Sequence, residues 1–151
     1  MPPEPLTFRL VPYVQVSSQR AVGFLAGHSE LDAWETYDTF DTQQKRAVNV
    51  RMEHWIAGNN RPGTMFHGFP NRSGYEECFV FKYQEHRFYG FLCNPLPESN
   101  GRFRLCALTT YDWKSEWETD ESILPEVEQW RTNSVGFVYP EYRWGGAAWN
   151  N

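Results

Sequence analysis

The stretch YEECFVFKYQEHRFYGFLC, residues 75–93, decides the fold together with RFRLCALTT at 102–110. Large apolar side chains alternate along 75–83, and the run HRFYGFLC at 86–93 follows after only Gln84 and Glu85. Alternation with a period of two is typical of a β-strand, and so short a connection requires antiparallel pairing, because a parallel return needs a long crossover. We therefore predict three antiparallel strands at 75–83, 86–93 and 102–110.

An amphipathic helix is predicted immediately before this meander. From Phe40 to Ile56, apolar side chains recur every three or four residues, which gathers them on one helix face. Thr39 or Asp41 can cap the start of this helix, and Gly58 can end it. The aromatic and methionine side chains on that face are expected to be core residues.

Shorter elements flank this centre. Residues 6–13, LTFRLVPY, alternate and predict an N-terminal strand, whereas the apolar piece VGFL at 22–25 fits no element. A short C-terminal helix is predicted at about 122–130, with Pro125 tolerated in its first turn. Residues 132–151 form an aromatic, glycine-containing tail without a period.

These elements describe one α+β domain, in which an N-terminal helix packs on a small antiparallel sheet and is followed by a short C-terminal helix. The 151 residues, 40% of them hydrophobic, suffice for one core. We divide the chain into an extension at 1–35, the domain at 36–131 and the tail at 132–151. No apolar run approaches the roughly 20 residues of a membrane span, and residues 1–5 do not resemble a secretion signal, so a cytoplasmic location is expected.

The three cysteines, Cys78, Cys93 and Cys106, lie within apolar segments. We expect small buried residues in a reducing compartment. The sequence contains no Cys-x-x-Cys or His-x-x-His pair, and its four histidines are scattered, so neither a metal site nor a cofactor is predicted.

The net charge of −5 is unevenly distributed. Residues 41–114 hold ten basic and seven acidic side chains, whereas residues 115–151 hold two basic and seven acidic ones. A basic middle is consistent with an anionic partner and equally with an ordinary mixed surface.

The order of a helix, a glycine-containing loop, an apolar hairpin, a strand ending in lysine and a short helix resembles the RelE/ParE/HigB superfamily of bacterial toxins, in particular its phage-derived, HigB-like branch. The segments that carry the resemblance are GYEECFVF at 74–81, HRFYGF at 86–91 and LCALTTYDWK at 105–114. The resemblance covers residues 38–131. It implies cytoplasmic, ribosome-associated mRNA as the substrate and an antitoxin or another protein as a partner.

The resemblance also implies a chemistry without a metal ion. Many RelE-like toxins drive a ribose 2′-hydroxyl onto the adjacent phosphate, which requires a base, cations at the phosphate and a proton donor for the leaving oxygen. Arg87 matches the family's central arginine and is the expected phosphate clamp. Lys82, His86 and Lys114 are expected to supply charge or proton transfer, and Tyr111 an acid or a stacking surface. Further contacts are expected from Arg72, Arg102, Arg104, Trp113 and Trp117.

Several positions depart from the family pattern. Cys78 stands where the family has an arginine, and His86 where it has a tyrosine. WETD at 117–120 replaces Lys-Thr-Pro, and its carboxylates would repel a phosphate. These departures predict weakened or lost ribonuclease activity.

Three alternatives stay open. Arg87 could be a surface arginine that is exposed to water or paired with Glu76 or Glu77. The chain could be a non-catalytic, phage- or prophage-encoded module that binds protein through its aromatic tail. The seven Trp and eight Tyr residues also fit a carbohydrate-binding module, against which the odd cysteine count and the missing secretion signal argue.

Overall fold

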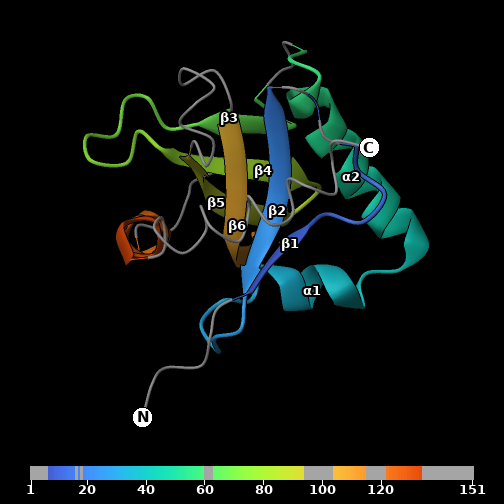
Figure 1. Ribbon diagram of the computed structural model, residues 1–151, viewed down its shortest axis with the longest axis horizontal. Helices are drawn as coiled ribbons and strands as arrows, with labels where there is room; N and C mark the ends of the chain where they lie inside the picture. The colour runs from blue at the N-terminus through green and yellow to red at the C-terminus, as the bar shows by residue number, and fades with distance from the viewer. Residues whose placement is uncertain are drawn as a thin grey trace.

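The computed structural model describes residues 7–15, 17, 19–59, 63–93, 104–114 and 122–133. One mixed sheet with the strand order β1-β2-β6-β5-β4-β3 forms its centre (Figure 1). Its strands are β1 (Thr7–Leu10), β2 (Arg20–Ala26), β3 (Phe66–Gly68), β4 (Cys78–Tyr83), β5 (His86–Cys93) and β6 (Arg104–Trp113). The helices are α1 (Ala33–Thr39), α2 (Thr42–Ile56) and one at 123–133. The α+β class is confirmed, but six strands, not three, form the sheet.

The apolar piece at 22–25 belongs to β2, in the interior of the sheet. β2 pairs antiparallel with β1 and parallel with β6, so the prediction of a purely antiparallel sheet was wrong. Every residue from Ala21 to Ala26 is buried. A strand buried on both faces reads as a continuous apolar run without alternation, which is why its sequence did not identify it.

The predicted helix is not N-terminal, because β1, β2 and α1 precede it. α2 begins at Thr42, and Asp41 is its cap: the Asp41 carboxylate accepts from the Gln44 backbone N–H at 2.8 Å, and the Gln44 side chain accepts from the Asp41 N–H at 3.0 Å. Phe40 lies before the helix. Gly58, at φ 78°, follows its last turn, as predicted.

The meander of β4, β5 and β6 is confirmed with adjusted ends. β5 occupies its predicted range, β4 starts at Cys78 and not at 75, and β6 extends to Trp113. The glycine-containing loop expected between the helix and the hairpin contains the short strand β3, which pairs with β4. Residues 94–103 and 134–151, which include most of the predicted tail, lie outside the described residues.

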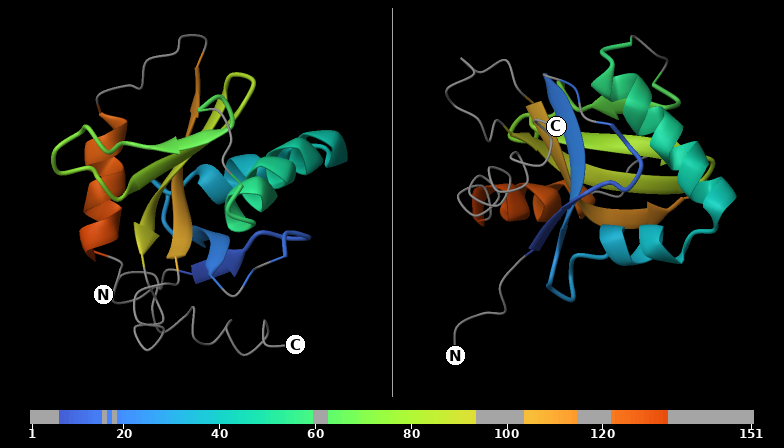
Figure 2. Two further views of the ribbon diagram at one scale, coloured as in Figure 1. Left: turned by 90° about the horizontal axis from the view of Figure 1, so that it is seen from above. Right: turned by 45° about the vertical axis from the view of Figure 1, so that its right-hand side comes forward.

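Helices cover both faces of the sheet (Figures 1 and 2). α1 and α2 pack on one face, where Tyr37, Met52 and Trp55 meet Phe24, Phe81 and Phe88. The helix at 123–133 packs on the other through Leu124 and Val127. No helix of the described residues combines the length and apolar character that crossing a membrane would need.

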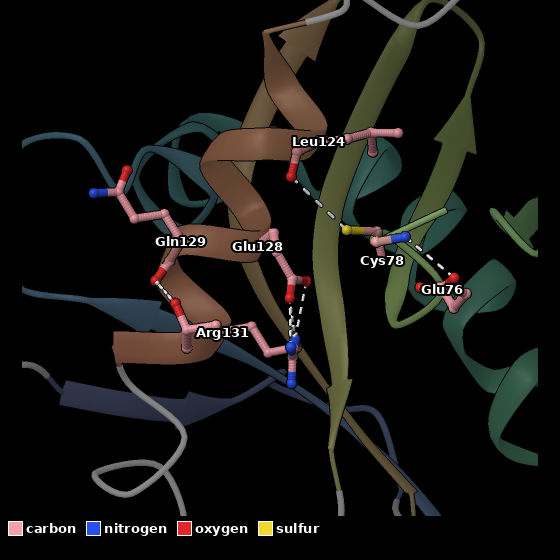
Figure 3. Close-up of polar contacts among 8 residues, drawn as sticks. Glu76, Cys78, Leu124, Glu128, Gln129 and Arg131 are labelled. Carbon is pink, nitrogen blue, oxygen red and sulfur yellow. Dashed lines mark hydrogen bonds and ion pairs between the residues drawn. The ribbon is translucent and has the colours of Figure 1, made fainter. Parts of the chain in front are cut away.

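The helix at 123–133 is fixed against β4 (Figure 3). The Cys78 thiol lies 3.9 Å from the carbonyl oxygen of Leu124, and Glu128 pairs with Arg131. Cys78, Cys93 and Cys106 are all buried and free, as predicted. Burial raises the pKa of Cys78 and of Cys93 to about 12.

Candidate functional site

The five predicted catalytic residues lie at the end of the sheet where β4 turns into β5. Gln84 (φ 53°) and Glu85 make this turn, and the register places Lys82 opposite Arg87, which in turn lies opposite Asp112 of β6. Lys82 and Arg87 lie on the same sheet face as the paired residues Val80 and Tyr89, but nearer to the turn. Val80 and Tyr89 belong to the core under the helix at 123–133. Lys82 and Arg87 are half-buried and lie just outside that core.

The structure distributes the five predicted catalytic residues over both faces of the sheet. Lys82 and Arg87 share the face of the helix at 123–133, and Lys114 is close enough to lower the pKa of Lys82. His86 and Tyr111 lie on the opposite face, under α1 and α2. The five residues therefore do not share one face, because neighbouring residues of a strand point to opposite faces.

A β-bulge decides the side on which Tyr111 lies. Tyr89 pairs with Thr110, whereas Gly90 pairs with Leu108, so Thr109 is an extra residue of β6. Without it, Tyr111 would share the face of Ala107 and of Arg87. With it, Tyr111 pairs with Phe88 on the face of the helices α1 and α2.

His67 of β3 joins the cations on the Arg87 face. It pairs with Val80, which lies two residues before Lys82 on the same face of β4. Burial lowers the pKa of His67 most, the Gly68 carbonyl raises it, and the charges of Lys82 and Arg87 lower it further. We call His67, Lys82, Arg87 and Lys114 the cationic surface. His67 was not among the predicted site residues, since three residues of strand after a glycine-containing turn give no periodic signal.

Arg87 is oriented by its own turn and not by an acidic partner from β4. Its guanidinium donates to the carbonyl oxygens of Gln84 at 2.5 Å and His86 at 3.0 Å. The alternative pairing with Glu76 or Glu77 is not observed: Glu77 contacts Arg104 at 3.4 Å, and Glu76 accepts from the Gly74 N–H. Arg87 is thus held by the turn that connects β4 to β5.

His86 and Tyr111 form a structural contact beneath α1. The His86 Nδ1 lies 2.7 Å from the Tyr111 hydroxyl, and the His86 ring meets that of Phe40 at 4.8 Å. The Tyr111 N–H donates to the Asp32 carboxylate at 2.8 Å. Burial lowers the pKa of His86 and raises that of Tyr111. These contacts fasten the start of α1 to β5 and β6.

The remaining predicted binding residues do not gather around Arg87. Arg104 begins β6, and Lys114 follows the other end of that strand, about 30 Å away at the usual rise per residue. Arg72 is exposed in the connection from β3 to β4. Trp113 is 60% exposed and pairs with His86, on the face opposite Arg87. Arg102 and Trp117 lie outside the described residues.

A groove of about 630 Å³ lies away from the cationic surface, between the segment after β1 and the helices α1 and α2. Its lining includes Tyr13, which is 96% exposed, and Val50, which is 40% exposed. Lys45 adds a positive charge and Glu53 a negative one. The groove carries no dominant charge, whereas the cationic surface does.

No protein-family model, curated protein or solved structure matches this chain. Among the described residues, no group of three or more His, Cys, Asp or Glu side chains could hold a metal ion. The cationic surface offers three permanent charges and one imidazole at the end of a rigid sheet. This combination can bind a phosphate and can exchange one proton with a ligand.

Proposed function

We propose that this chain is a RelE/HigB-like protein that binds single-stranded RNA at its cationic surface and retains at most a weak ribonuclease activity. The observation that carries the proposal is the gathering of Lys82, Arg87 and Lys114 at one sheet end. The order of a helix, an antiparallel meander and a C-terminal helix over residues 42–133 also supports it, because the resemblance rests on that order.

The charges of this surface suit a phosphodiester. A guanidinium engages two phosphate oxygens at once, and two ammonium groups add charge without a fixed geometry. Asp112, opposite Arg87, and Glu85, in the adjacent turn, offset part of the charge. We therefore expect moderate affinity that depends strongly on salt: three phosphate contacts predict a slope of about −2 for the logarithm of affinity against that of salt concentration.

We expect weak cleavage because the predicted catalytic residues are divided between the two faces of the sheet. Attack by a ribose 2′-hydroxyl needs cations at the phosphate and proton transfer at both oxygens. His86 was expected to supply charge or proton transfer, and Tyr111 an acid or a stacking surface. Both lie on the other face and contact each other. Two of the groups that the resemblance implies for catalysis are thus absent from the cationic surface.

The binding part is tested by fluorescence anisotropy with a labelled single-stranded RNA of about twelve nucleotides. We expect Arg87→Ala to weaken binding roughly tenfold, since a hydrogen bond to a charged group contributes about 1.5–3 kcal/mol. Arg46→Ala, which removes the same charge from the exposed face of α2, is the matched control and should change the affinity less than about twofold. Equal losses in both variants would reduce the effect to net charge and refute the proposed site.

The activity part is tested by induced expression in bacteria. We expect slowed growth and shortened mRNA, both relieved by Arg87→Ala. Normal growth with intact mRNA would exclude the ribonuclease and leave RNA binding to be judged by the anisotropy measurement.

The groove beside α2 favours a second candidate function, a protein-binding module, because Tyr13 and Val50 are exposed along it. Exposed tyrosine is a residue type that anchors interfaces. Affinity purification should then recover a protein with the parent and with Arg87→Ala, but not with Tyr13→Ala. Identical recovery from all three variants would exclude this groove as the binding surface.

A further inference from the structure

His67 differs from the other described histidines in its position and its contacts. It lies on β3, the last strand of the sheet, and is half-buried on the cationic face. Its Nδ1 is 2.7 Å from the carbonyl oxygen of Gly68, and its ring meets that of Phe69 at 5.0 Å. These two contacts fix the orientation of the imidazole.

The contact with Gly68 also fixes the tautomer. A carbonyl oxygen only accepts hydrogen bonds, so Nδ1 carries the hydrogen. In the neutral ring, the free lone pair then belongs to Nε2, and an imidazole of this form can take a proton at that nitrogen. Burial together with the charges of Lys82 and Arg87 favours the neutral ring near neutral pH.

The charged groups around His67 come from three strands. β4 contributes Lys82 and β5 contributes Arg87, both close enough to act on its pKa. Beyond them at the same sheet end lie Asp112 of β6 and Lys114 directly after it. A phosphate held by Lys82 and Arg87 would therefore lie on the same sheet face as the neutral imidazole.

We propose that His67 is the general base of the weak ribonuclease activity. The inference rests on the function proposed above, and it gives His67 the proton transfer that the resemblance had offered to Lys82, His86 or Lys114. His67 Nε2 takes the proton from a ribose 2′-hydroxyl as the 2′ oxygen forms a bond to the adjacent phosphorus. The bond from phosphorus to the 5′ oxygen breaks, and that oxygen takes a proton from water. The products are a 2′,3′-cyclic phosphate and a 5′-hydroxyl, and His67 then releases its proton to solvent.

His86 is unsuited to this step for a geometric reason. Its Nδ1 lies 2.7 Å from the Tyr111 hydroxyl, and its ring stacks on that of Tyr83 at 5.7 Å and meets that of Phe40 in a T-shaped contact at 4.8 Å. It lies on the face on which α1 and α2 pack. The His86 side chain therefore lies on the sheet face opposite Arg87. His67 lies on the same face as Arg87.

The test compares His67→Asn with His86→Asn on a short RNA that has one cleavable bond. The Asn side-chain nitrogen can take the place of Nδ1 and donate to Gly68, so His67→Asn removes the base and keeps the local hydrogen bond. We expect it to lose at least about a hundredfold in cleavage rate while RNA affinity changes less than about twofold. His86→Asn should keep its rate within about threefold. Binding is measured with an RNA that lacks the reacting 2′-hydroxyl.

Two further measurements separate a base from a structural residue. The rate of the parent should rise with pH along an acid limb whose midpoint lies below the ordinary histidine pKa of 6.5, and this limb should disappear in His67→Asn. Added imidazole should restore part of the rate of His67→Ala, because it can occupy the space of the missing ring. Thermal unfolding confirms that each variant is folded at the assay temperature.

Several results would overturn the inference. Cleavage by His67→Asn at the parent rate, or an equal loss in His86→Asn, would remove His67 from the role of base. RNA binding by the parent without any cleavage would also end the inference and leave the binding function intact. Absence of RNA binding by the parent would remove the proposed function and the inference together.

Discussion

The close approach of Gly90 to β6 yields the sharpest prediction on stability. Gly90 lies at the bulge where the pairing shifts from Thr110 to Leu108. A Cβ atom at this position would lie 2.3 Å from the Ala107 carbonyl oxygen and 2.8 Å from the Leu108 Cα. Both atoms are backbone, so a clash can be relieved only by moving one strand away from the other.

Gly90→Ala should therefore lower the free energy of unfolding by about 2–3 kcal/mol, the upper part of the range for overpacked sites. At this chain length, each kcal/mol corresponds to about 2–4 °C in the unfolding temperature. We expect a decrease of roughly 4–12 °C, measured by circular dichroism at the β-sheet band. Urea unfolding should give the corresponding shift of the midpoint.

Gly68→Ala is the matched control, since it is also a strand glycine of the same sheet. Its Cβ would find nothing nearer than 3.7 Å, an ordinary contact. Because alanine loses less backbone entropy on folding, this variant should be unchanged or more stable by up to about 1 kcal/mol. A difference of 2 °C in unfolding temperature corresponds to about 0.5–1 kcal/mol. If the unfolding temperatures of Gly90→Ala and Gly68→Ala differ by less than this, β5 and β6 do not approach as closely as described and the reasoning fails.

Two further predictions concern the helix cap and the thiols. Asp41→Ala removes the capping box of α2 and should cost about 1 kcal/mol in denaturant unfolding; Thr39→Ala, at the other cap position expected from the sequence, should cost clearly less, and equal costs would contradict the assignment. Because burial raises the pKa of all three cysteine thiols, the folded protein should react slowly with a thiol reagent at pH 8, and faster as the pH rises. Three thiols should react at once after denaturation in guanidinium chloride; rapid labelling of the folded protein would show that the core is open.

Local patterns were sufficient for the elements whose sequence carries a period. β4 and β5 alternate and are joined by two residues, and α2 has apolar side chains at helical spacing with a cap at Asp41. β2 could not be found in this way, because burial on both faces removes the alternation. β3 is too short to show any period, and with it the candidate base His67 was missed.

The sequence by itself determined one pair of this surface. Because only Gln84 and Glu85 join the strands β4 and β5, antiparallel pairing must bring Lys82 opposite Arg87. Only the tertiary structure decided which residues join them. The bulge at Thr109 places Tyr111 on the face of α1 and α2, and β3 brings His67 to the cations. The reason is that side-chain direction in a strand depends on register, and one extra residue reverses it for every residue that follows.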